Sequence, residues 1–313
     1  MPGIMLIDGN SLGFAAQSTS KLTAGEMEVQ AIFHFLKSLR ITLLGYSGFK
    51  PIVLWDGRSW RYDHFAGYKA KRKEDPKAIA EKERYKAQKP WIARATRTLG
   101  VNQMMAINWE ADDLAGLLTS KARSRGDSVV LISGDKDWLQ LVEPGVLWFD
   151  PIREVKITYR DFQTQTGYVN GRAFLQGKAL KGDSSDCIPG VGGIGDKAAP
   201  ILLEKFGSVE KFWAAAETPG FELPEELARY RKKLTEFCAP EGRDRFAFNM
   251  MLMDLKTAER PKPERLTLDK GAFDRAAFRS ICEDLSFHSL LRDLDNFCAA
   301  FNNNQRDKDN EAA

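Results

Sequence analysis

The sequence predicts an α/β protein with a mostly parallel, twisted sheet flanked by helices, followed by an α-helical C-terminal region. Two observations support this prediction. In the first half of the chain, four continuous apolar runs of strand length alternate with amphipathic helical patterns. Strand-like runs then disappear after Gly182, where helical patterns dominate. The 313 residues are enough for one large domain or for a core domain with a smaller second one.

The expected strands are apolar runs that lead into an aspartate within a few residues. They cover residues 4–7, 51–55, 128–132 and 146–149. Continuous apolar runs of this length are typical of parallel strands buried on both faces. Helical patterns with spacing near 3.6 occupy 26–44, 75–98 and 112–125 between them. This alternation indicates a doubly wound sheet, whose ligands gather outside the carboxyl ends of its strands.

The second half of the chain shows helical patterns joined by polar connectors. The patterns cover 197–206, 209–217, 224–236, 244–252 and 273–295, and the connectors cover 216–224 and 258–268. We therefore expect a core domain over 1–181 and a helical C-terminal domain over 182–300. The polar residues 302–313 are expected to form a disordered tail.

Composition excludes several classes of function. The N-terminus has no signal-peptide pattern, and no stretch approaches the ~20 apolar residues of a membrane span, so we expect a soluble cytoplasmic protein with no membrane partner. None of the four cysteines lies in a C-x-x-C pair, which favours free thiols over a zinc site. The three histidines show no signature of a Ser-His-Asp or Cys-His mechanism.

A basic segment covers residues 57–97. It holds thirteen Lys and Arg against five Asp and Glu, with aromatic residues between them, although the net charge of the whole chain is only +3. A solvated helix face is the usual explanation of a charge run. Because the excess charge of this segment is positive and the segment is rich in aromatic residues, it favours contact with a nucleic acid.

Nine carboxylates stand at expected strand ends or helix starts. They are Asp8, Asp56, Glu110, Asp112, Asp113, Asp135, Asp137, Asp183 and Asp186. Any one of them is more often a helix cap than a metal ligand. Gathered at one edge of a sheet they would repel each other strongly, and divalent cations would compensate that repulsion. Oxygen ligands without His or Cys favour Mg²⁺ or Mn²⁺, and two such ions about 4 Å apart can hydrolyse phosphodiesters.

Six sequence segments, in a fixed order over roughly residues 4–210, match one family. They are LIDGN, LWDG, RYDHFAGYKAKR, EADD, SGDKDWLQL and GDSSDCIPGVGGIGDKAA. The chain resembles the flap-endonuclease superfamily, especially phage 5′→3′ exonucleases and the 5′-nuclease domain of bacterial DNA polymerase I. The resemblance implies a 5′-nuclease core of the PIN-like type. It also implies that the protein acts in a bacterial cell or in a phage-infected host cell.

The resemblance also implies roles for the acids. Asp56, Glu110, Asp112 and Asp135 match ligands of the catalytic metal. Asp137, Asp183 and Asp186, with Asp113 nearby, match a second cluster, and Asp8 matches a ligand acting through water.

The basic segment matches the helical arch of the family, over about residues 62–98. Lys69 and Arg72 would face the scissile phosphate, and Tyr68 would stack on or position a nucleotide. Arg58, Arg61 and Lys71 are expected to contact DNA. The arch would cover a single-stranded 5′ end or flap.

A glycine-rich segment matches a helix–hairpin–helix DNA-binding motif, over about residues 183–207. Its backbone N–H groups would approach a DNA phosphate at Gly190, Gly192, Gly193 and Gly195, and Lys197 and Lys205 would add contacts. Relatives bind K⁺ there. The segment also satisfies GxGxxG, but it lacks the preceding strand of a Rossmann fold and the GK[ST] of a P-loop. The family usually has Asn in place of Cys187 and often Pro in place of Gly192.

We therefore expect a structure-specific 5′-nuclease, both 5′→3′ exonuclease and flap endonuclease, that acts as a monomer on DNA with a 5′ end, nick or flap through two metal ions. Protein partners are not indicated by the sequence. Three alternatives differ in class. A nuclease-dead DNA-binding protein would lack the acids that are present, and a haloacid-dehalogenase phosphatase would need an acid where Asn10 stands. A PIN-type ribonuclease shares the acidic centre but lacks the hairpin and the arch.

Overall fold

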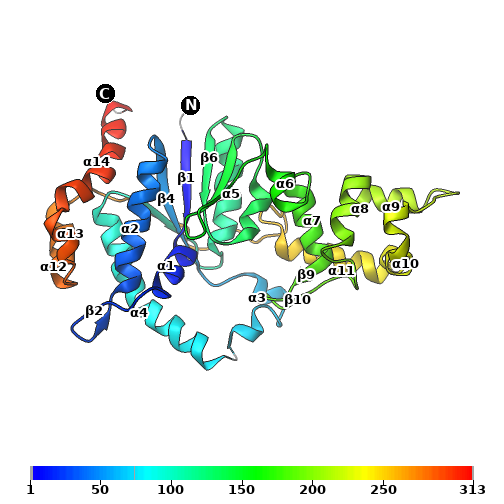
Figure 1. The fold of residues 1–313 in the computed structure, drawn as a ribbon, viewed down its shortest axis with the longest axis horizontal. Helices are drawn as coiled ribbons and strands as arrows, with labels where there is room; N and C mark the ends of the chain where they lie inside the picture. The colour runs from blue at the N-terminus through cyan, green and yellow to red at the C-terminus, as the bar shows by residue number, and fades with distance from the viewer. Residues whose placement is uncertain (1–2, 74, 312–313) are drawn as a thin grey trace.

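The computed structural model describes residues 3–73 and 75–311 and contains a sheet of seven strands with helices on both faces (Figure 1). The strands are β1 Gly3–Asp8, β2 Thr23–Ala24, β3 Met27–Glu28, β4 Phe49–Trp55, β5 Asn102–Met105, β6 Ser128–Ile132, β7 Val146–Asp150, β8 Val155–Ile157, β9 Gly182–Asp183, β10 Ile188–Pro189 and β11 Thr267–Asp269. The helices of the first half are α1 Gly9–Gln17, α2 Gln30–Gly45, α3 Arg61–His64, α4 Pro76–Thr98, α5 Ala111–Ser124, α6 Phe162–Thr166 and α7 Gly171–Lys181. Those of the second half are α8 Ala198–Phe206, α9 Val209–Ala216, α10 Arg231–Cys238, α11 Pro240–Met253, α12 Arg275–Asp284, α13 His288–Arg292 and α14 Leu294–Glu311. Three short 3₁₀ helices are η1 Ala70–Lys73, η2 Lys136–Leu141 and η3 Glu225–Tyr230.

The sheet has the strand order β11-β5-β4-β1-β6-β7-β8. Its five central strands run parallel, whereas β11 and β8 pair antiparallel at the two edges. The mostly parallel sheet expected from the sequence is confirmed, with all four predicted strands in it. Because the central strands are parallel, the residues that follow them all emerge at one edge of the sheet.

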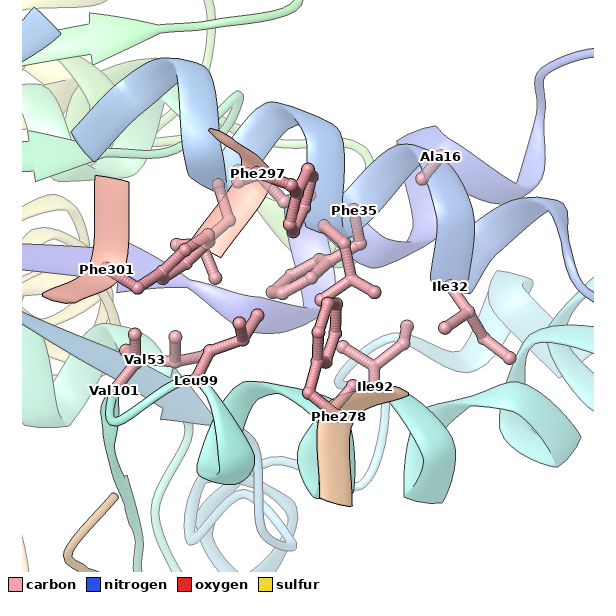
Figure 2. Packing of buried hydrophobic residues seen from close by; sticks show 14 of the residues in the cluster. Ala16, Ile32, Phe35, Val53, Ile92, Leu99, Val101, Phe278, Phe297 and Phe301 are labelled. Carbon is pink, nitrogen blue, oxygen red and sulfur yellow. The ribbon is translucent and has the colours of Figure 1, made fainter. Parts of the chain in front are cut away.

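Both faces of the sheet are buried, as continuous apolar strands require. In β1, Met5 and Ile7 belong to one core and Leu6 to the other. The first core packs under α1, α2 and α4, and it includes Phe278, Phe297 and other residues from the C-terminal helices (Figure 2). The second packs under α5, η2 and α6. The two helical layers hold the sheet rigid and leave its carboxyl edge open for chemistry.

A third core joins α7 to α8–α11, at the far end of the molecule from α12–α14 (Figure 1). It is rich in aromatic rings, including Phe212 and Phe237, which stack with centroids 6.3 Å apart. The division expected at 181/182 assigned α12–α14 to the C-terminal domain, but they pack on the sheet beside α2 and α4. Helix α7, expected in the first domain, contributes Leu175, Ala179 and Leu180 to the third core.

Some elements differ from the sequence expectation. Strand β11 lies within the expected connector 258–268 and just beyond it, and its three residues are exposed, so they show no hydrophobic period. The backbone of α14 is helical to Glu311 in the segment for which a disordered tail was expected, and its side chains from 303 onward lie outside the described residues. In the described part of the chain, no helix is long and apolar enough to cross a membrane.

Candidate active site

Two aspartates begin the site at the ends of neighbouring parallel strands. Asp8 ends β1, caps α1 by accepting from the Ser11 N–H at 2.9 Å, and accepts from the Ser133 hydroxyl at 2.8 Å. Asp56 follows β4 and accepts from the Ala111 N–H at 2.7 Å. Burial, and then the charge of Asp56, raises the pKa of Asp8 to about 7. The two carboxylates therefore repel each other at the centre of the sheet edge.

Glu110 is the N-cap of α5 and the most heavily hydrogen-bonded acid of the site. Its Oε2 accepts from Ser59, Arg61 and Tyr68 at 2.8–3.0 Å, and its Oε1 accepts from Lys69 Nζ. Burial alone would raise the pKa of Glu110, but the charges of Lys69 and Arg61 outweigh it and lower that pKa to about 2. Glu110 is therefore ionised and bound by two cations.

Asp113 and Arg61, predicted as a neighbour of the second acidic group and as a DNA contact, form a buried ion pair in this structure. Asp113 has no exposed surface, and its two oxygens accept from the Arg61 guanidinium at 3.0 Å each. Arg61 is 3% exposed and also donates to the carbonyl oxygen of Leu252. The charges of Arg61 and Asp113 are thus neutralised by each other inside the fold, and their predicted roles stay predictions.

Asp112 and Asp135 complete the first acidic group. Asp112 accepts from the Trp138 indole at 2.6 Å, and Asp135 follows β6 and caps η2 by accepting from the Asp137 N–H. Desolvation, followed by the charge of Asp135, raises the pKa of Asp112 well above its ordinary value. Desolvation and the Asp137 charge likewise raise the pKa of Asp135 to about 6, although its side chain reaches solvent. Burial and neighbouring carboxylates therefore both disfavour the ionised form of these two acids.

A second acidic group lies beside the first. Asp137, Asp183 and Asp186 bring carboxylate oxygens within 4.8 Å of one another. Lys178 of α7 binds Asp137 and lies 2.7 Å from Asp183. Burial works against the charge of Lys178, but the charges of Asp137 and Asp183 outweigh it and raise its pKa. An ammonium between these carboxylates marks a position where a cation is stabilised.

The base of the arch joins the two groups. Lys69 binds Glu110 through its side chain, and its backbone N–H donates to the carbonyl oxygen of Asp186 at 3.0 Å. Tyr68, expected to stack on or position a nucleotide, is 3% exposed in this structure and donates its hydroxyl to Glu110. Burial, and then Glu110, raises the pKa of Tyr68, which keeps the hydroxyl a donor.

The remaining cations of the basic segment differ in position. Lys71 is exposed in η1, and the side chain of Arg72 lies outside the described residues. Arg58 is exposed and forms a bidentate pair with Asp63 at 2.9 and 2.6 Å. Helix α4 carries Lys89 back over the Trp55 ring, 5.0 Å from its centroid. Burial lowers the pKa of Lys89, and the nearby Asp56 opposes that shift.

The glycine-rich hairpin follows the second acidic group. Gly192 and Gly193 are exposed with φ of 100° and 92°, conformations that glycine adopts readily. A Cβ on Gly190 would lie 2.3 Å from the Lys181 carbonyl oxygen, so only glycine fits there. Asn249 fixes the hairpin by donating to the Pro189 carbonyl oxygen at 2.9 Å. The exposed backbone of the loop is thus held rigidly at the surface.

The other hairpin residues lie at its flanks. Gly195 has no neighbouring atom where a Cβ would stand, and Lys197 is exposed at the N-cap of α8. Lys205 lies at the far end of α8 and pairs with Glu226 at 2.5 Å. Gly195 and Lys197 are therefore open to a ligand, and Lys205 would have to leave Glu226 to reach one.

Comparison with known families agrees with this geometry. A family model described as the N-terminal resolvase-like domain of 5′–3′ exonucleases matches residues 3–167. A second, described as the C-terminal SAM fold of 5′–3′ exonucleases, matches residues 169–258. The chain belongs to the 5′–3′ exonuclease family. The sequence resemblance is therefore confirmed, and it extends beyond residue 210.

Relatives of this chain include bacterial DNA polymerases. The thermostable DNA polymerase I of Thermus filiformis is 30% identical over 296 residues, which cover 93% of this chain and 33% of the polymerase. DNA polymerase I of Bacillus subtilis is 28% identical over 302 residues, which cover 93% of this chain and 32% of that polymerase. The chain thus spans about a third of the length of these relatives.

Solved structures share the fold of this chain. A bacteriophage T5 flap endonuclease, in a pseudo-enzyme–product complex with DNA and metal ions, matches with a TM-score of 0.67 and 23% identity over 95% of this chain and 99% of that chain. The catalytic core of Rad2 in complex with DNA substrate matches with a TM-score of 0.56 and 15% identity. The match covers 91% of this chain and 87% of that chain. The overall fold is therefore shared with these proteins.

Several residues of the site were not anticipated from the sequence. They are Lys178, Ser59, Ser133, Trp138 and Lys89. Ser133 directly follows the apolar run 128–132, which the sequence predicts to be a strand. Its position at a strand end could therefore have indicated that it belongs to the site. Lys178 sits in an ordinary helical segment, and only the packing of α7 against η2 brings it to the acids.

Proposed function

We propose that this member of the 5′–3′ exonuclease family is a structure-specific 5′-nuclease, acting on DNA both as 5′→3′ exonuclease and as flap endonuclease. One observation carries the proposal: two acidic groups lie side by side, and Lys69, at the base of a basic arch, contacts both of them. A hydrolase of phosphodiesters needs negative ligands for cations and a positive side chain for the phosphate within one site.

The donors fit hard divalent cations, which we propose to be Mg²⁺ or Mn²⁺. They are all oxygens, and burial, followed by the charge of neighbouring carboxylates, raises the pKa values of Asp8, Asp112 and Asp135. Asp56, Glu110, Asp112 and Asp135 would hold one ion, with Asp8 acting through water. Asp137, Asp183 and Asp186 would hold the second. Bound there, such ions supply an activated water and stabilise the leaving oxygen.

The chain's own residues bind and orient the DNA. Lys69 would leave Glu110 and bind the scissile phosphate. Its ammonium would then stabilise the negative charge that develops on that phosphate. The exposed backbone of Gly192, Gly193 and Gly195, with Lys197, would bind a phosphate of the duplex. We propose K⁺ as the ion that links this loop to the phosphate. Lys71 and Arg72 would contact the strand under the arch, and the protein would act as a cytoplasmic monomer.

Product mapping on 5′-labelled nicked, gapped and flap duplexes with Mg²⁺ tests this proposal. We expect release of short 5′ products from nicked DNA and of whole flaps from flap DNA. The Asp186→Asn variant should cut neither and should still bind DNA in Ca²⁺. RNA flaps of the same sequence separate this function from a PIN-type ribonuclease, because preferential cutting of RNA would contradict it.

A further inference from the structure

Lys89 of helix α4 is a half-buried lysine beside an aromatic ring. Its ammonium stands over Trp55, 5.0 Å from the centroid of the ring. Within the described part of the chain, the ammonium forms no hydrogen bond or ion pair. Burial lowers the pKa of Lys89, because the charged form loses hydration and gains only the attraction of the aromatic face in return. A cation kept in such a place is suited to receive an anion from outside the chain.

Contacts from α4 place Lys89 at the first acidic group. Trp55, under the ammonium, immediately precedes Asp56, whose charge opposes the effect of burial on the pKa of Lys89. One turn earlier on α4, the Tyr85 hydroxyl lies 3.3 Å from the carbonyl oxygen of Gly9, the first residue of α1. A Cβ on Gly9 would in turn lie 2.6 Å from the Trp55 ring. Two residues of α4 thus touch the chain where β1 and β4 end.

The carboxylates at these two strand ends act on α4 without pairing with it. After burial, the charges of Asp8 and Asp56 raise the pKa of the Tyr85 hydroxyl. Asp56 accepts from the Ala111 N–H at 2.7 Å, which ties its carboxylate to the start of α5. Lys89 is therefore close enough to Asp56 for their charges to interact, and it is still available to another anion.

A phosphate of DNA would complete this arrangement. Divalent cations at the first acidic group would neutralise the carboxylates nearest to Lys89, and its ammonium would then need a different negative partner. A backbone phosphate has two non-bridging oxygens, so it can accept from an ammonium while it lies beside such cations. Lys69 reaches the same group at Glu110, and Lys89 reaches it at Asp56. The two lysines would therefore contact the strand from different acids.

We propose that Lys89 binds a backbone phosphate of the DNA strand that lies at the first acidic group. The inference rests on the proposed function, because it requires a strand at the acids. Lys69 must leave Glu110 to reach a phosphate, whereas Lys89 has no ion pair with a described residue to break. Because the contact is to a phosphate, it carries no preference for a base.

Binding of flap DNA in saturating Ca²⁺, followed by fluorescence anisotropy, tests the proposal with DNAs that each carry one neutral methylphosphonate. The replaced groups are the scissile phosphate and, one at a time, its nearest neighbours on the same strand. Lys89→Met keeps an apolar stem over Trp55 and removes the charge. It should bind intact DNA about tenfold more weakly than the wild type, as for loss of one charged hydrogen bond. At one position the methylphosphonate should weaken binding by the wild type and cause no further loss in Lys89→Met.

The salt dependence of binding gives a second measure. The slope of log affinity against log salt should be shallower in Lys89→Met by about 0.7–0.9, the value for one phosphate contact. Lys89→Arg keeps the charge and should retain both the wild-type slope and the loss at that position. The matched control is Lys37→Met, at an exposed lysine of α2 that also stands over an aromatic ring, 5.4 Å from the Phe33 centroid. It should bind every DNA as the wild type does.

Urea unfolding separates this role from a structural one. Since Lys89→Met removes a half-buried charge, it should unfold at the same urea concentration as the wild type or at a higher one. A lower midpoint with an unchanged salt slope would show that Lys89 only supports the fold, and it overturns the proposal. Equal losses in the wild type and in Lys89→Met at every methylphosphonate overturn it as well. Failure of the wild type to cut any DNA in Mg²⁺ overturns the proposed function instead, and the binding comparison is independent of that result.

Discussion

The backbone N–H of Lys69 donates to the carbonyl oxygen of Asp186 at 3.0 Å, while the Lys69 ammonium binds Glu110. One residue thus connects the arch to both acidic groups. Lys69 also has a φ of 54°, in the left-handed region that costs a non-glycine residue of the order of 1 kcal/mol or more. The fold accepts this strain at a lysine that contacts both groups.

Replacing Lys69 should remove catalysis and leave the fold intact. In Lys69→Ala we expect the single-turnover rate of DNA cleavage to fall by ~10²–10³, as for loss of one preorganised electrostatic group. Lys69→Gly relieves the backbone strain and should lose as much rate, because the ammonium is missing in both variants. Lys121→Ala, at an exposed lysine of α5, is the control. A wild-type rate in Lys69→Ala would exclude the ammonium from catalysis.

Arg61 should stabilise the fold. Arg61→Met leaves the buried Asp113 carboxylate without its main partner, which typically costs about 3–5 kcal/mol. Urea unfolding without metal should therefore show a large fall in the free energy of unfolding. Arg58→Ala removes an exposed ion pair and should leave that free energy unchanged. Equal stability of the two variants would contradict the structural role of Arg61.

Lys178 should compete with a cation for the second acidic group. In Lys178→Met the carboxylates of Asp137 and Asp183 lose their ammonium, so Mn²⁺ should bind there more tightly, by about tenfold for each ~1.4 kcal/mol of repulsion removed. Calorimetric titration of the protein without DNA measures this. Lys181→Met is matched, because Lys181 lies on the same helix and pairs with the exposed Asp196. Weaker Mn²⁺ binding in Lys178→Met would show that the lysine positions the acids instead.

Metal binding should depend on pH. Without metal, the pKa of Asp8 is raised to about 7 and that of Asp135 to about 6, so both carboxyls take up protons as the pH falls through these values. A metal ion needs the ionised form, and its affinity should therefore rise with pH from about 6 to about 8 with release of protons. Titrations in buffers of different ionisation enthalpy detect those protons. Affinity and heat that do not vary with pH or buffer would contradict the prediction.

The strand-end acids were predictable because two local signals agree. Apolar runs ending in aspartate mark parallel strands, and parallel strands present their ends at one edge. Burial was not predictable in the same way. The family resemblance implied roles at the DNA for Arg61 and Tyr68, and in this structure partners from α5 and from the end of α11 enclose these side chains. A charge count cannot show which cations are neutralised within the fold. Lys178 was missed for the opposite reason, since its partners are distant in sequence.

The position of α12–α14 has a consequence for biosynthesis. These helices leave the ribosome after the rest of the described core, yet Phe278, Phe297 and Phe301 belong to the core cluster that includes residues of α2, α4 and the sheet (Figure 2). Until they arrive, that layer is open to water and to other nascent chains. A gene fragment that stops at residue 258, where the second family match ends, should therefore yield an aggregating product even though it encodes every acid of the site.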